Sequence, residues 1–88
     1  MPNPRWMVEI DFDEDDTHTR AVARATVRSG QTLMTRGDAY RNPRDERQPL
    51  IGEEVAAARA LIALGSELLQ SAASHIEQAT HHPVHLVR

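Results

Sequence analysis

The strongest constraint on the fold is one long stretch of helical periodicity in the C-terminal half of the chain. From residue 51 to residue 80, apolar or small residues recur at alternating intervals of four and three. This spacing places them on one narrow stripe of an α-helix, and Pro83 follows where a helix would have ended. The pattern predicts a helix over 51–80 and a tail over 81–88. The stripe consists of Ile51, Val55, Ala58, Ile62, Gly65, Leu69, Ala72 and Ile76.

The first forty residues follow a different period, because apolar and polar residues alternate there. Such alternation is typical of strands that bury one face. The acidic segment 13–16 and the pair Ser29-Gly30 interrupt it and favour turns. The sequence therefore predicts an antiparallel meander of strands over 6–12, 19–28 and 31–40.

Both layers are rich in small residues, which allow two backbones to approach closely. Gly65 costs about 1 kcal/mol of helix propensity relative to Ala, so we expect it to have a packing role. An 88-residue chain has room for one core. We therefore predict a single domain over 1–88, a two-layer α+β fold of order β-β-β-α with sheet order 1-2-3. In this fold Ala21, Ala23, Ala25 and Gly37 are expected to face Ala58, Ile62, Gly65 and Leu69.

Composition excludes several classes of protein. The chain has no cysteine, which excludes disulfides, thiolate metal sites and a cysteine nucleophile. No stretch approaches the roughly 20 apolar residues that span a bilayer, and the N-terminus lacks the apolar run of a signal peptide. We therefore expect a cytoplasmic protein without membrane contact. Because no nucleophile–base spacing or phosphate-binding glycine loop is present, we expect neither an enzyme nor a cofactor.

Two polar clusters partly match metal sites. Asp11, Asp13 and Asp15 have the one-three-five spacing of a calcium loop, but the later Gly and Glu of that loop are missing. We interpret the cluster as a hydrated hairpin loop, with weak cation binding as the alternative. The histidine-rich tail lacks converging ligands with supporting partners, so we assign no metal-binding residue. Its histidines are His81, His82 and His85, with His75 upstream.

Three segments resemble a known family. They are Arg-Asn-Pro-Arg-Asp at 41–45, Ile-Gly-Glu-Glu-Val-Ala-Ala-Ala-Arg-Ala-Leu at 51–61, and Thr80 with Pro83-Val84. With the order of strands, they resemble a family of short actinobacterial proteins whose fold is similar to a double-stranded-RNA-binding domain without the N-terminal helix. The resemblance covers nearly the whole chain and implies a fold but no activity. Where that family tends to have two glycines in the third strand, this chain has Thr35 and Gly37.

Two surfaces are candidates for binding a protein. The first is the sheet face away from the helix, where basic side chains share the surface with Glu9 and Asp11. The alternative there is an ordinary solvated surface of cross-strand ion pairs. The second is a leucine flank of the helix, which a narrow sheet would leave uncovered unless the loop 41–50 or the tail 84–87 folds over it. The candidate residues are Arg20, Arg24, Arg36 and Tyr40 on the sheet and Leu61, Leu64 and Leu68 on the helix.

These observations favour a non-enzymatic protein-interaction protein, with self-association as a homodimer as one form of it. The alternative is a degenerate nucleic-acid-binding module, and a weaker third hypothesis is a metal-responsive protein that uses the histidine tail. Double-stranded-RNA modules carry a basic cluster at the start of their last helix, where this chain has Glu53 and Glu54. We therefore expect no specific binding of double-stranded RNA.

Overall fold

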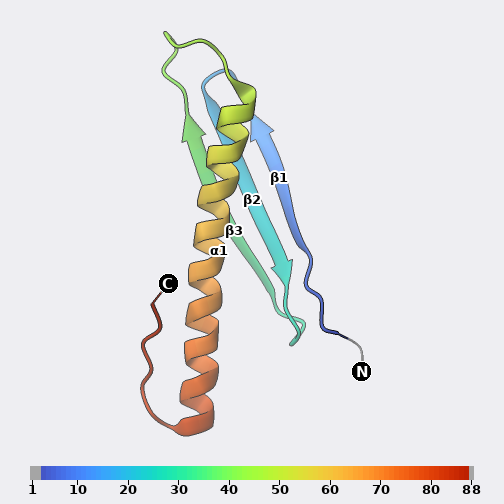
Figure 1. The fold of residues 1–88 in the computed structure, drawn as a ribbon, viewed down its shortest axis with the longest axis vertical. Coiled ribbons are helices and arrows are strands. Elements are labelled where there is room, and N and C mark those ends of the chain that lie inside the picture. The colour runs from blue at the N-terminus through green and yellow to red at the C-terminus, as the bar shows by residue number, and fades with distance from the viewer. Residues whose placement is uncertain (1–2, 88) are drawn as a thin grey trace.

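Three antiparallel strands and one long helix make up the structure (Figure 1). The computed structural model describes residues 3–87. Both strand pairs are antiparallel and the sheet order is β1-β2-β3, so the predicted α+β fold with a meander and a C-terminal helix is confirmed. The elements are β1 (Val8–Glu14), β2 (His18–Thr26), β3 (Thr32–Tyr40) and α1 (Pro49–Thr80).

Short side-chain contacts and one positive φ angle shape the two hairpin turns. Asp15 Oδ1 accepts hydrogen bonds from the backbone N–H groups of Thr17 and His18, both at 2.9 Å, and so closes the turn after β1. The second turn places Gly30 at φ 91°, a conformation that glycine adopts without steric cost. The loop comprises residues 15–17 rather than the predicted segment 13–16, because β1 continues through Glu14 and β2 begins at His18.

Helix α1 begins at Pro49. Proline suits the first helical position, because a backbone N–H at that position would have no acceptor within the helix and proline has no N–H. This start lies two residues before the predicted one, so Glu53 and Glu54 lie in the second turn rather than the first. The helix ends at Thr80. His81 follows in the left-handed conformation and donates its backbone N–H to the Glu77 carbonyl at 2.7 Å.

Small residues form most of the core between the sheet and the helix. Alternate residues of β2 are fully buried, and the helix backbone lies directly on Gly37 of β3. A Cβ atom built on Gly37 would lie 2.2 Å from the Ala56 carbonyl oxygen and 2.3 Å from the Ala60 nitrogen. The predicted close helix-on-sheet contact therefore exists. The buried residues are Ala21, Ala23, Ala25, Leu33, Ala39, Ala56, Ala60 and Leu64, with Thr19.

The predicted face of the helix is wrong. Ala56, Ala60 and Leu64 face the sheet, whereas Ile62 is exposed and an added Cβ at Gly65 would meet nothing within 4 Å. Ala58, two residues beyond Ala56, lies about 200° around the helix and is exposed. The physical reason is size. At Gly37 the helix backbone reaches the sheet where two alanines, Ala56 and Ala60, lie one turn apart, whereas on the predicted stripe Ala58 is followed one turn later by the larger Ile62.

The helix covers part of the sheet and extends beyond it. It packs on β3 and β2, and Figure 1 shows β1 to the side of it. A helix of 32 residues is about 48 Å long, whereas a strand of nine residues is about 30 Å. The tail turns back beside the overhanging end, on the side away from β1, with Val84 N–H bound to Glu77 Oε1 at 2.9 Å. Within residues 3–87, no helix has the length and apolar character needed to cross a membrane.

Candidate functional site

The sheet face away from the helix carries the predicted basic residues, and carboxylates pair with each of them. Arg20 Nη2 lies 2.6 Å from Asp13 Oδ2, and Arg24 Nη1 lies 3.6 Å from Asp11 Oδ2. The strand register explains these pairs, because Asp13 is opposite Arg20 and Arg24 is diagonal to Asp11. The predicted alternative of a solvated ion-pair surface therefore describes these two arginines. Exposed ion pairs of this kind stabilise a fold by at most about 1 kcal/mol each.

A connected polar cluster lies at the upper end of the same face. Asp38 Oδ1 is 2.6 Å from His18 Nε2, and Asp38 Oδ2 is 3.0 Å from Arg36 Nε. The hydrogen bond from Arg36, followed by that from His18, lowers the pKa of the Asp38 carboxyl. The His18 ring stacks on Tyr40 with centroids 4.5 Å apart and planes 5° apart. Arg36 is therefore bound to a carboxylate as well, and Tyr40 is an exposed ring that His18 holds in place.

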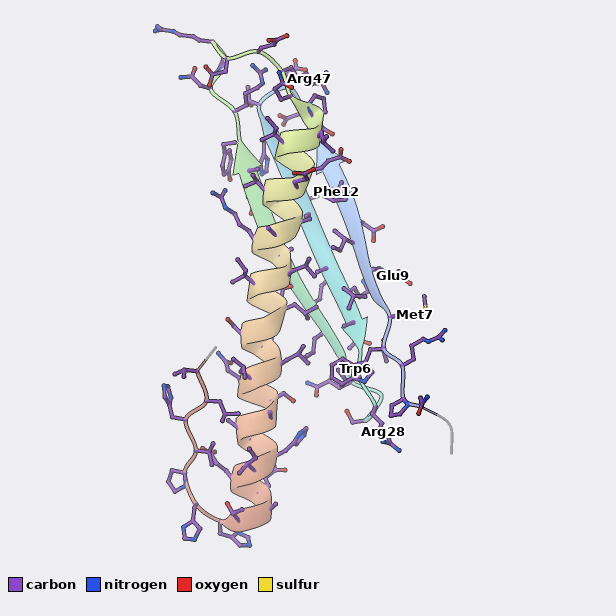
Figure 2. All side chains as sticks on the ribbon, in the orientation of Figure 1. Trp6, Met7, Glu9, Phe12, Arg28 and Arg47 are labelled. Atoms are coloured by element: carbon purple, nitrogen blue, oxygen red, sulfur yellow. The ribbon has the colours of Figure 1, made fainter. Side chains whose placement is uncertain are left out.

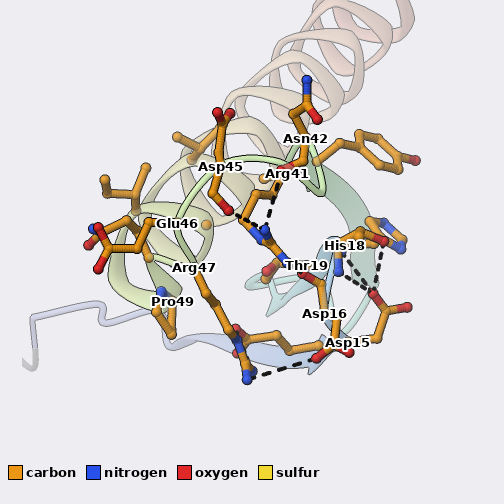
Figure 3. A pocket seen from close by; sticks show the side chains of 18 of the residues that line it. Asp15, Asp16, His18, Thr19, Arg41, Asn42, Asp45, Glu46, Arg47 and Pro49 are labelled. Carbon is orange, nitrogen blue, oxygen red and sulfur yellow. Dashed lines mark hydrogen bonds and ion pairs between the residues drawn. The ribbon is translucent and has the colours of Figure 1, made fainter.

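A cavity of about 340 Å³ lies between the first hairpin turn, the loop after β3 and the start of α1 (Figure 3). Arg41 spans it. Its guanidinium donates to the carbonyl oxygens of Asp16, Asn42 and Asp45, which ties the two loops together. Arg47 Nη2 lies 3.8 Å from Glu14 Oε1, and Arg47 Nη1 lies 3.9 Å from Asp16 Oδ1. Opposite charges therefore meet across the opening of the cavity. The donors of Arg41 are occupied by backbone carbonyls, which makes it a structural residue rather than an anion receptor.

The Asp15 carboxylate at the edge of the cavity is engaged within its own turn, where it accepts hydrogen bonds from the backbone N–H groups of Thr17 and His18. The Thr17 hydroxyl also lies 3.5 Å from Asp15 Oδ1. Among the described residues, no group of three or more His, Asp or Glu side chains is placed to hold a metal ion. Asp11 and Asp13 lie on β1 against arginines and do not form a loop with Asp15.

The inner face of β1 carries apolar side chains that the helix leaves uncovered. Val8 is opposite Ala25, and Phe12 is opposite Ala21; because these alanines are buried under the helix, Val8 and Phe12 point to the same side. Yet Val8 and Phe12 are 45 and 42% exposed, and Trp6, which precedes the strand, is 49% exposed. Figure 2 shows Trp6 and Phe12 on the helix side of β1, with Met7 and Glu9 pointing away.

One flank of the helix completes this surface. Arg59 Nη1 donates to the Asp38 carbonyl at 2.7 Å, so Arg59 marks the flank that faces β3. Leu61 follows Arg59 by two residues, which is about 200° around the helix. It therefore lies on the flank opposite Arg59, toward β1. Leu61 is 44% exposed. We call the open apolar surface between β1 and this flank the inner trough. Its exposed residues are Trp6, Val8, Phe12 and Leu61, and the core residues Ile10, Leu64 and Leu68 are partly or fully buried.

The predicted leucine flank is therefore divided. Leu64 was expected to need an external cover, but it is 3% exposed and belongs to the core. Leu68 is half-buried and packs against that core, and Leu61 alone remains open. Alternation placed the apolar residues of β1 in the core, so the trough was not predicted. The available signal was width, because a helix about 10 Å across covers three strands spaced 4.8 Å apart only when it is centred on the middle strand.

Comparison with known proteins places this arrangement in a family. The model of the Rv2632c-like family matches residues 4–85. The chain belongs to the Rv2632c-like family. Its relatives include Uncharacterized protein Mb1767 of Mycobacterium bovis (strain ATCC BAA-935 / AF2122/97), 42% identical over 82 residues, which cover 93% of this chain and 86% of that protein. Uncharacterized protein Rv2632c of Mycobacterium tuberculosis (strain ATCC 25618 / H37Rv) is 39% identical over 77 residues, which cover 88% and 82%.

The Rv2632c-like fold is also known from a solved structure. The crystal structure of Rv2632c has a TM-score of 0.84 to this chain at 35% sequence identity, and the match covers 94% of this chain and 98% of that one. The predicted membership of a family of short actinobacterial proteins is thereby confirmed. The names of these Rv2632c-like relatives state no activity or ligand, so the function must be argued from the geometry.

Proposed function

We propose that this protein is a non-enzymatic protein-interaction module that binds its partner in the inner trough. The observation that carries the proposal is the uncovered apolar face of β1. Trp6, Val8 and Phe12 alternate as core residues do, but they remain about half exposed because the helix lies over β2 and β3. A contiguous apolar surface of this kind on a small protein marks a site of association.

The energetics favour the trough over the other surfaces. An aromatic side chain buries about 150–250 Å² when covered, so the exposed halves of Trp6 and Phe12 offer roughly 100 Å² each. At about 25 cal/mol per Å², covering each ring contributes roughly 2 kcal/mol. The exposed ion pairs of the outer face contribute less, and their partners already satisfy them. Aromatic side chains in a partly enclosed apolar site are also typical anchors of interfaces.

A nucleic-acid-binding function, and with it a fold like that of a double-stranded-RNA-binding domain, is the second candidate. The β-β-β-α order favours it. Arg20, Arg24 and Arg36, however, each have a carboxylate partner, so binding phosphate would first require breaking an ion pair. Glu53 and Glu54 near the start of the helix would repel a phosphate backbone. We therefore rank it below protein binding. The cytoplasmic location expected from the sequence stays a prediction.

A site-specific photo-crosslinker tests the proposed function. A photoreactive phenylalanine analogue placed at Phe12 in mycobacterial cells should capture protein upon irradiation, because position 12 lines the trough. The matched control is the same analogue at Tyr40, an aromatic position on the outer face that is more exposed. Strong capture from position 12 and little from position 40 supports the proposal. Capture from position 40 alone moves the binding surface to the outer face, and capture from neither contradicts the proposal.

A further inference from the structure

We propose that the partner in the inner trough is a second copy of this chain, packed trough to trough with the two helices antiparallel. This inference rests on the proposed function and names its partner. It follows from three properties of the trough: the apolar area that it leaves open, the charges at its two ends, and the acidic outer side of its edge strand.

The open area suits an isologous dimer. The exposed parts of Trp6, Val8, Phe12 and Leu61 together offer roughly 350 Å² of side-chain surface. Two copies packed face to face cover this surface twice, which gives roughly 700 Å² of apolar surface. Specific interfaces begin at roughly 1,200 Å², so the polar rim around the trough must supply the rest. A two-fold axis through the trough would place Phe12 of each copy near Leu61 of the other, so that both copies cover the same residues.

Among residues 3–87, the charges without an ion-pair partner at the two ends of the trough are opposite, because Arg47 at the upper end (Figure 2) is paired with Glu14 and Asp16. Glu53 and Glu54 lie in the second turn of α1, beside the upper end of the trough. Arg28 lies at the lower end beside Trp6 (Figure 2), and Arg5 precedes Trp6 in the chain. Within residues 3–87, no carboxylate lies within ion-pair distance of Arg5 or Arg28, and no cation within that distance of Glu53 or Glu54. An antiparallel pair brings each acidic end to a basic end, whereas a parallel pair opposes like charges.

The edge of β1 argues against the other symmetric arrangement. Two copies could join their sheets edge to edge, with β1 antiparallel to β1. That register would bring Glu9, Asp11 and Asp13 of one outer face beside the same residues of the other. Like charges directly opposite each other destabilise a strand pair. Acidic residues along an open strand are also a common device against edge pairing. The apolar trough is therefore the surface on which a second copy gains most.

Sedimentation of the purified full chain over a concentration series tests the proposal. We expect a reversible dimer below about 1 mM. Leu61→Glu should be monomeric over the same range, because it places a charge in the trough. Ile62→Glu is the matched control: Ile62 is the neighbouring residue, is 52% exposed, and points away from β1, so this variant should still dimerise. Equal helical circular dichroism of both variants shows that the fold is retained.

Charge reversal tests the antiparallel orientation. Arg28→Glu and Glu54→Arg should each weaken the dimer about tenfold, and the double variant should regain most of the loss. A wild-type chain that stays at the 9.9 kDa monomer up to about 1 mM overturns the proposal. So does a Leu61→Glu variant that dimerises as well as Ile62→Glu, and a double reversal without recovery overturns the orientation. If the pure chain is monomeric while position 12 captures a different protein in cells, the proposed function stands and the second copy is excluded.

Discussion

Replacing Gly37 with alanine should destabilise this fold more than the addition of one methyl group normally does. In a strand an alanine is ordinarily better tolerated than a glycine, because glycine loses more conformational freedom on folding. Here the added Cβ would lie 2.2 Å from the Ala56 carbonyl oxygen, 2.3 Å from the Ala60 nitrogen and 2.9 Å from the Arg59 carbonyl carbon. All three are backbone atoms, so no side-chain rotation relieves the overlap.

The magnitude follows from the displacement that is required. Ordinary carbon contacts lie at about 3.5–4.0 Å, so the helix must move away by more than about 1 Å. A gap of 0.5–1 Å already forfeits a quarter to a half of the dispersion energy at each contact. The movement also stretches the hydrogen bond from Thr35 Oγ1 to the Ala60 carbonyl, which is 2.8 Å long. Overpacking of about 1–3 kcal/mol and a hydrogen bond of about 1 kcal/mol give an expected loss of about 2–4 kcal/mol.

Urea unfolding followed by circular dichroism measures this loss. A chain of this length has a total stability of about 4–13 kcal/mol, so the variant should unfold at a much lower urea concentration. Gly65→Ala is the matched control, because Gly65 is helical and an added Cβ meets nothing within 4 Å. This control should gain about 1 kcal/mol. A Gly37→Ala variant within about 0.5 kcal/mol of wild type would refute the proposed backbone contact.

Three further predictions follow from the polar contacts. Thr35→Val keeps the shape but removes the bond to the Ala60 carbonyl, so it should cost about 1 kcal/mol in the same urea assay, and no loss would contradict that bond. The hydrogen bond from Arg36 lowers the pKa of Asp38, so its contribution to stability is present above the ordinary carboxyl value of about 3.9 and is lost as pH falls through the lower folded value. Thermal melts between pH 6 and pH 2 should show a steeper fall for wild type than for Asp38→Asn, and equal falls would contradict the assignment. At about 150 mM salt, a 20-base-pair RNA duplex should show no saturable binding below about 100 µM, and a micromolar salt-dependent isotherm would contradict this.

The inner face of β2 was predictable because alternation is a local signal. Ala21, Ala23 and Ala25 occupy every second position, and a one-residue slip of register would turn all three to the other face. The length of the helix was predictable for a similar reason, since apolar spacing persists up to Thr80. Both features depend on the order of residues within one element.

The rotation of the helix was not predictable from its apolar stripe. The chain has two apolar arcs on α1, one through Ile62 and one through Leu64, and hydrophobicity alone favours the first. The choice is made by Gly37, a residue of another element, because Ala56 and Ala60, two small residues one turn apart, let the helix backbone reach it. A single sequence does not state which two surfaces meet, so the size match between them becomes visible only in the folded structure.

The same contact explains why the trough exists at all. Gly37 lies in β3, an edge strand, so the helix axis is drawn toward that edge of the sheet. β1 is two strand spacings from β3, about 9.6 Å, whereas the helix reaches only about 5–6 Å to either side of its axis. The helix therefore covers β3 and β2 and leaves the apolar side chains of β1 open. With the glycine in the central strand instead, the helix would lie over the middle of the sheet and reach both edges. The close packing that stabilises this small core thus also leaves the surface on which we expect a second copy to bind.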